Sequence, residues 1–200
     1  MTNLQDKDPM IVQGTNMENI QVKKKKVNTW MLAEAGIVLA MAWVLGQIKI
    51  FPMPMGGSVT AGSMVPLFVF AYRWGGKKGI LVCALYGVID FILGAKFSFH
   101  PVSLLFDYPV AFGFIGIAGF FGKKTVGLML GTVVALFGRF ACHVLSGVVV
   151  FSSYAPEGVN PLLYSILYNG SYLLPELIIS FVLVFLLLKL AKLPEPRILI

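Results

Sequence analysis

Six ionisable side chains lie inside the apolar runs of this 200-residue sequence, where a charge is costly and usually serves a function. They are Glu34, Asp90, Asp107, Arg139, His143 and Glu176. Arg139 and His143 are four residues apart, so a helix would present both on one face. Arg139 needs a buried partner, and Asp90 is the acid that we expect at a similar depth. Asp107 and His143 could act either as a base and an acid or as contacts to a ligand.

The elements that carry these residues are predicted to cross a membrane, because 58% of the chain is hydrophobic and only 12% is charged. About a quarter of an ordinary soluble domain is charged, so this composition excludes a typical soluble enzyme and a disordered chain. The apolar runs predict six spans, at 29–48, 59–73, 79–94, 103–121, 125–151 and 161–190. The prediction is an all-α membrane protein with a tail at 1–28, a six-helix domain at 29–192 and a tail at 193–200.

The basic residues predict the orientation of these spans. With the N-terminus inside, thirteen Lys and Arg residues fall in inner segments and two, Lys49 and Lys96, in outer ones. Cytoplasmic loops collect Lys and Arg, so both termini are predicted to be cytoplasmic. The same asymmetry accounts for the net charge of +7, so we do not expect nucleic acid as a partner.

Polar residues of three predicted spans lie at one depth. At 1.5 Å per residue, Asp107 and Tyr108 lie about 6–8 Å below the outer end, His143 and Asn169 about 12 Å, and Tyr164 about 5 Å. Aromatic residues crowd the same end, namely Tyr86, Phe97, Phe99, Phe151, Tyr154, Tyr164, Tyr168 and Tyr172. An aromatic pocket with a few convergent polar groups is the usual form of a small-molecule site. A carboxylate and aromatic faces favour a flat, cationic or amino-bearing ligand from outside.

At these residues the sequence resembles the thiamine-specific substrate-binding (S) component of energy-coupling factor (ECF) vitamin transporters. The resemblance runs from about residue 30 to residue 190. Its landmarks follow one another in the same order as in the family, at 56–60, 64–75, 100–101, 105–108, 139–158, 164–165 and 168–169. The resemblance implies an S-component fold of six helices that captures thiamine from the outer side of a bacterial cell membrane.

The resemblance also assigns roles to residues. It implies that Asp107 and Tyr108 bind the aminopyrimidine, that His143 contacts the ligand and that Phe151 stacks on the thiazolium. The remaining positions that it implies for the site are Tyr164 and Asn169 as polar contacts, Tyr86 and Phe97 as aromatic lining, and Ser58 or Thr60 in the first loop. No catalytic residue and no metal ligand are expected, and Glu176 receives no role.

A small-residue face on the first span is the expected partner surface. In the family, such faces dock on a transmembrane coupling protein that is bound to two cytoplasmic ATPases, and Gly36 and Ala40 occupy the docking positions. The sequence contains no G-x-x-x-x-G-K-[ST] loop, so ATP would be used by these partners only, and no cofactor is expected.

Three other readings stay open at this stage. The same architecture could serve another vitamin or a thiamine precursor. A membrane-embedded enzyme would use Asp107 and His143, but the sequence has no zinc motif and no serine elbow. An independent channel or secondary transporter would be expected to show internal repeats, and none is clear.

Overall fold

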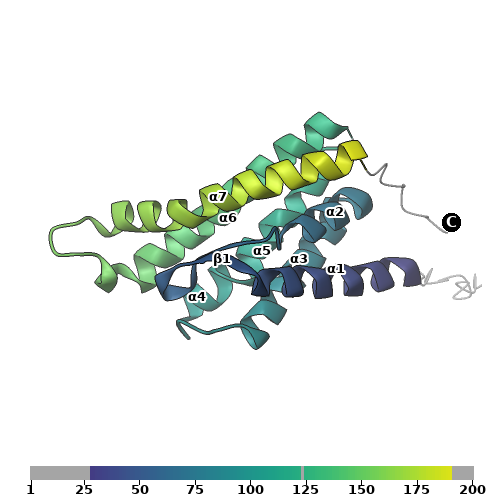
Figure 1. Cartoon of the computed structure of the whole chain (residues 1–200). Coiled ribbons are helices and arrows are strands. Elements are labelled where there is room, and N and C mark those ends of the chain that lie inside the picture. The colour runs from purple at the N-terminus through teal and green to yellow at the C-terminus, as the bar shows by residue number, and fades with distance from the viewer. Residues whose placement is uncertain (1–27, 123, 191–200) are drawn as a thin grey trace, which may run out of the picture.

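The computed structural model describes residues 28–122 and 124–190 of this chain (Figure 1). The predicted tails at 1–28 and 193–200 lie outside the described residues, except for Asn28. The helices are α1 (Thr29–Gln47), α2 (Val65–Trp74), α3 (Gly76–Leu93), α4 (Pro101–Phe106), α5 (Pro109–Gly116), α6 (Thr125–Val150) and α7 (Pro161–Leu190). The strands are β1 (Lys49–Pro52) and β2 (Ser58–Thr60), and short 3₁₀ helices form at Pro54–Gly56, Ile117–Phe120 and Ser152–Tyr154.

Four segments of the described chain are long and apolar enough to cross a membrane. They are Thr29–Gln47, Pro101–Phe120, Thr125–Val150 and Pro161–Leu190. The two other predicted spans correspond to α2, which has only 10 residues, and to α3, which carries Lys77, Lys78 and Asp90. A multi-pass helical membrane protein is therefore confirmed, while the count of six spans and the cytoplasmic termini stay predictions.

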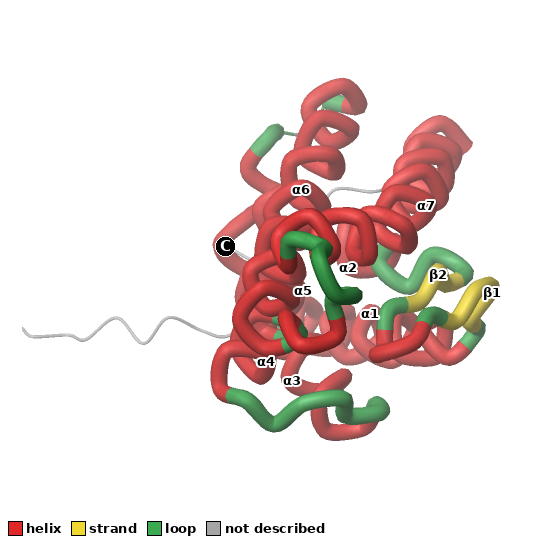
Figure 2. Tube along the Cα trace, turned by 90° about the vertical axis from the view of Figure 1, so that its left-hand side faces the viewer, coloured by secondary structure: helices red, strands yellow, loops and turns green. Residues whose placement is uncertain are grey.

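The predicted second span is wrong at its start. Residues 58–60 form a strand that pairs antiparallel with β1, with Phe51 opposite Val59, and the helix begins only at Val65 (Figure 2). Hydrophobicity alone did not separate the strand from the helix. The turn signals were present, because Pro54, Gly56 and Gly57 favour a hairpin connection.

The predicted fourth span is interrupted at the candidate site. Helix α4 ends at Phe106, and α5 starts at Pro109, so Asp107 and Tyr108 lie at a break. The backbone of Tyr108 is non-helical, with φ −116° and ψ −92°. Proline lacks an N–H and disfavours helical geometry in the residue before it, which explains the break.

The hairpin, α4 and the α6–α7 connection lie at one end of the molecule, and the start of α1 and the end of α7 lie at the other (Figure 1). Helices α6 and α7 run antiparallel beside each other. A buried core follows α2, α5 and α6, and its most enclosed large side chains include Leu67, Phe68, Phe70, Ile115 and Leu128. Large apolar side chains on the outside, such as Phe137, face the surface that lipid would cover.

An ion pair joins α1 to α2 at the end opposite the hairpin. Arg73 Nε lies 2.6 Å from Glu34 Oε1, and Arg73 Nη2 donates to Glu34 Oε2 at 3.1 Å. A two-bond contact between a guanidinium and a carboxylate fixes orientation as well as distance. Glu34 therefore has a structural partner on α2.

Helices α3 and α5 approach closely because Gly116 has no side chain. A Cβ built on Gly116 would lie 2.1 Å from the backbone nitrogen of Ile80 and 2.3 Å from the carbonyl carbon of Gly79. One turn earlier, a Cβ on Gly113 would meet only Ala84 and Ile80 side-chain atoms, at 3.7 and 3.9 Å. Close backbone approach through small residues is a main source of helix association in membranes.

We predict that Gly116→Ala separates α3 from α5 and lowers stability by about 1–3 kcal/mol. Thermal unfolding of the purified protein in detergent measures the effect. Gly113→Ala is the matched control on the same helix, and it should leave the melting temperature unchanged or slightly raised, since Ala is the better helix former. Equal melting temperatures for the two variants would contradict the proposed close contact.

Candidate functional site

A cavity of about 220 Å³ lies among the hairpin, α3, α4, α6 and α7. All ten residues that the sequence predicts as ligand contacts line it: Ser58, Thr60, Tyr86, Phe97, Asp107, Tyr108, His143, Phe151, Tyr164 and Asn169. They come from segments that are up to 111 residues apart, from Ser58 to Asn169. Their common lining of one cavity supports the depth argument, and their contact with a ligand stays a prediction.

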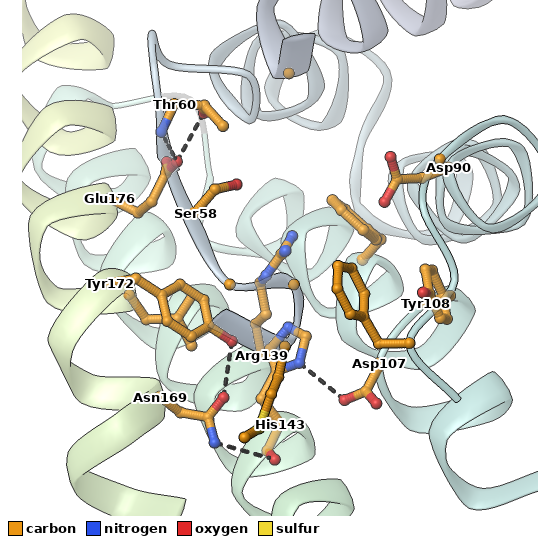
Figure 3. Close-up of a pocket in the computed structure, with 18 of the residues that line it drawn as sticks. Ser58, Thr60, Asp90, Asp107, Tyr108, Arg139, His143, Asn169, Tyr172 and Glu176 are labelled. Atoms are coloured by element: carbon orange, nitrogen blue, oxygen red, sulfur yellow. Dashed lines mark hydrogen bonds and ion pairs between the residues drawn. The ribbon is translucent and has the colours of Figure 1, made fainter. Parts of the chain in front are cut away.

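Asp107 is the polar centre of this cavity (Figure 3). Its Oδ2 accepts hydrogen bonds from Ser103 Oγ on α4 and Ser146 Oγ on α6, both at 2.6 Å. Its Oδ1 lies 3.0 Å from His143 Nδ1. A carboxylate offers about four acceptor positions, so one remains for a donor on a ligand.

His143 presents its other ring nitrogen without a protein partner. An ionised carboxylate only accepts hydrogen bonds, so the contact with Asp107 makes Nδ1 the donor. Nε2 is buried and has no hydrogen-bond partner among the described residues. Asp107 thus fixes the tautomer of the neutral ring and leaves Nε2 as an acceptor, which suits a ligand that brings its own donor.

Asn169 ties α7 to α6 beside His143. Its Nδ2 donates to the carbonyl oxygen of Ser165 at 2.9 Å and lies 3.3 Å from the carbonyl oxygen of His143. Its Oδ1 accepts the hydroxyl of Tyr172 at 2.7 Å. Asn169 is 4% exposed, so its predicted role as a ligand contact competes with these internal bonds.

Arg139 contacts an aromatic ring instead of an acid. Its Cζ lies 3.9 Å from the centroid of the Phe112 ring, and Nη1 lies 3.6 Å from the sulfur of Met64. The predicted Arg139–Asp90 ion pair is wrong, since Asp90 lines the cavity from α3 with no such contact. A cation over a ring face is attracted by the ring quadrupole, so Phe112 is a favourable contact for the guanidinium.

Glu176 is a cavity residue to which sequence reasoning gave no role. It accepts hydrogen bonds from the backbone N–H of Thr60 and, at 2.7 Å, from the Thr60 hydroxyl. Its position was visible in the sequence as an acid seven residues after Asn169, which places both on one face of a helix. The missing information was the hairpin, because the sequence placed Thr60 inside a span.

The charge around the cavity favours a cation. Three acids, Asp90, Asp107 and Glu176, line it against two bases, Lys49 and Arg139. Aromatic rings complete the walls. Tyr108 packs edge-on against Phe91 with ring centroids 5.1 Å apart, and Phe97 is 50% exposed. The arrangement can bind a small aromatic molecule that carries hydrogen-bond donors and a positive charge.

The comparisons with known proteins agree with each other. Residues 32–194 match the family described as thiamine transporter protein. Thiamine transporter ThiT of Bacillus subtilis (strain 168) is 37% identical over 175 residues, which cover 80% of this chain and 91% of that protein. Thiamine transporter ThiT of Lacticaseibacillus paracasei is 28% identical over 179 residues, which cover 80% of this chain and 88% of that protein. A solved structure of ThiT from Listeria monocytogenes superposes with a TM-score of 0.74 at 26% identity, covering 84% of this chain and 98% of that chain.

We predict that Asn169→Leu lowers stability by about 1–3 kcal/mol, because it leaves the buried Tyr172 hydroxyl without its acceptor. Thermal unfolding in the absence of ligand is the measurement. Adding Tyr172→Phe to the same chain removes the orphaned hydroxyl and should recover part of the loss. An Asn169→Leu variant that unfolds at the wild-type temperature would show that this network does not hold α6 and α7 together.

Proposed function

We propose, on the premise that this chain belongs to the thiamine transporter protein family, that its cavity binds thiamine for uptake driven by ATPase partners. Membership confirms two predictions from the sequence: the chain is a thiamine-specific S-component of the membrane, and it is not an enzyme. Uptake of thiamine is the function of this family of transporters. The individual contacts, the direction of capture and the ATPase-coupled mechanism are proposals.

The observation that carries the proposal is the pair of unused acceptors on Asp107 and His143. Thiamine joins an aminopyrimidine to a positively charged thiazolium ring. The amino group would donate to the free position on Asp107, and the neighbouring Nε2 of His143 accepts a second donor or faces the cationic ring. The acidic side chains around the cavity stabilise the positive charge.

Aromatic contacts would fix the plane of the ligand. In our proposal Phe151 stacks on the thiazolium, and Tyr108 and Tyr86 border the pyrimidine. Tyr164 supplies a hydroxyl from α7, and Ser58 supplies one from the hairpin. A cation over an aromatic face contributes about 2 kcal/mol or more when it is desolvated.

The proposed partner surface lies on α1. Gly36 and Ala40 are both exposed, and nothing lies within 4 Å of a Cβ built on Gly36. They are four residues apart and therefore share a face. Such a smooth stripe would let a helix of an ECF coupling protein approach closely. Two cytoplasmic ATPases on that protein would then drive uptake into a bacterial cell.

We predict that Asp107→Asn weakens thiamine binding at least tenfold, which is about 1.4 kcal/mol. The amide loses the negative charge and turns one acceptor into a donor, which faces serine hydroxyls or the ligand amine. Equilibrium binding of radiolabelled thiamine to the purified chain, freed of endogenous ligand, measures this.

Glu157→Gln is the control, since Glu157 is an exposed acid outside the cavity lining. Competition by riboflavin, biotin and the free aminopyrimidine tests the specificity. Unchanged affinity of Asp107→Asn would remove this carboxylate from the site, and stronger competition by another vitamin would replace thiamine as the ligand.

We predict that Gly36→Trp leaves thiamine binding intact and abolishes uptake when the chain is expressed with a coupling protein and ATPases. The bulky ring would occupy the space that close helix approach requires. Phe137→Trp, on a side chain that is 70% exposed on α6, is the control and should sustain uptake. Loss of binding in Gly36→Trp would instead make Gly36 an internal packing residue.

A further inference from the structure

One face of α7 lines the cavity along its whole depth. Ser165, Asn169, Tyr172 and Glu176 follow one another at spacings of four, three and four residues, and all are buried. These spacings keep side chains on one side of a helix. The first three residues contact one another or α6, whereas Glu176 reaches across to the hairpin.

Glu176 contacts the hairpin through two groups of Thr60, the backbone N–H and the side-chain hydroxyl. Glu176 is 3% exposed, and its Oε1 accepts from the Thr60 N–H and the Thr60 hydroxyl (Figure 3). The other oxygen, Oε2, is buried and has no hydrogen-bond partner among the described residues. A buried carboxylate is costly unless it is hydrogen-bonded, so the energetic reason to keep Glu176 here lies in its bonds to Thr60.

The backbone of Thr60 needs an acceptor from outside the hairpin. Strand β2 pairs with β1 along one edge, and its other edge faces α7. Away from water an unpaired N–H on such an edge is strongly unfavourable. Glu176 takes the place that the carbonyl oxygen of a third strand would occupy in a larger sheet.

The Thr60 hydroxyl connects this bond to the next element. It accepts the N–H of Ser63 at 3.2 Å, in the turn that leads into α2, and it donates to Glu176. One carboxylate therefore holds both the end of β2 and the turn after it. The Thr60 hydroxyl contacts both Glu176 Oε1 at 2.7 Å and Ser63 Oγ at 2.9 Å, so its one proton serves the protein, and Thr60 acts on the ligand site through its position rather than as a donor.

The hairpin forms one wall of the cavity. Met55, Gly56, Gly57, Ser58 and Thr60 all line it. The hairpin also lies close to α7, because a Cβ built on Gly57 would lie 2.7 Å from the Tyr172 ring. Any movement of this wall away from α7 would break the two bonds between Thr60 and Glu176.

We propose that Glu176 is a positioning residue that holds the β1–β2 hairpin over the cavity through Thr60 and thereby sets how slowly thiamine is released. The inference rests on the proposed function, because it takes thiamine as the bound molecule. It adds a residue that acts on the lifetime of the complex through the position of the hairpin.

The test is the release rate of radiolabelled thiamine from the full-length purified chain after addition of excess unlabelled thiamine. This rate is measured on molecules that have already bound thiamine, so a smaller folded fraction does not alter it. We expect Glu176→Ala to speed release about tenfold, since it removes two hydrogen bonds to a charged acceptor. Thr60→Val keeps the N–H bond and should speed release about threefold. Thr60→Ser keeps the hydroxyl and should release thiamine at close to the wild-type rate.

The double variant separates positioning from direct contact. If Glu176 acts through Thr60, Thr60→Val adds little to Glu176→Ala, and the double variant releases thiamine about tenfold faster than the wild type. Independent effects would multiply to about thirtyfold, and that result would overturn the inference. Release at the wild-type rate in both Glu176→Ala and Thr60→Val would overturn it as well.

Two controls complete the experiment. Ser180→Ala removes a buried hydroxyl one turn further along α7, outside the cavity lining, and should leave the release rate unchanged. Wild-type protein that retains no thiamine would overturn the proposed function, and this inference with it. Retention by the wild type with no coupling between Thr60 and Glu176 would overturn the inference alone.

Discussion

The cavity depends on the hydrogen bonds that converge on Asp107. A carboxylate placed below a membrane surface must be satisfied by protein groups, because lipid offers none. Ser103, Ser146 and His143 provide these groups, and in doing so they join α4 to α6. The break at Tyr108, before Pro109, ends α4 at Asp107, whose side chain lies within reach of these donors. The same contacts that make the acid tolerable also leave one acceptor position open to the cavity.

The same constraint explains the opposite wall. The hairpin brings strand edges into a region where an unpaired backbone group is unfavourable. Glu176 accepts a hydrogen bond from one such group, the N–H of Thr60. Asn169 joins α6 to α7 through hydrogen bonds to the carbonyl oxygens of His143 and Ser165. Each wall of the cavity is therefore held by a polar side chain whose bonds are internal, while His143 Nε2 and part of Asp107 remain unused. Internal bonds of this kind orient the polar groups of a site and so lower the cost of ordering them on binding.

Depth along the spans predicted that polar residues of three spans lie near one another. His143 and Asn169 lie at one level because helices rise uniformly, and the structure places both on the cavity. The partner of Arg139 was not predictable in this way, since depth does not say which way a side chain turns, and Phe112 on α5 proved to be the contact. The hairpin was missed because the strand at 58–60 leads into an apolar helix and shares its hydropathy. No role could be assigned to Glu176 from the sequence, because its partner Thr60 was predicted to lie in a helix and lies instead at the edge of a strand.

The arrangement also separates two tasks along the molecule. The cavity is lined by the hairpin, while the Glu34–Arg73 pair braces the start of α1 against the end of α2. Between them the small residues Gly36 and Ala40 stay on the outer face of α1, and the inner face of that helix packs through Ala35, Val38 and Ala42. A partner helix could therefore bind the outer face of α1 through Gly36 and Ala40 without itself contacting Thr60 or Glu176. Because α1 leads directly into β1, a shift of α1 would still reach the hairpin, and the bonds between Thr60 and Glu176 lie where that shift would be felt.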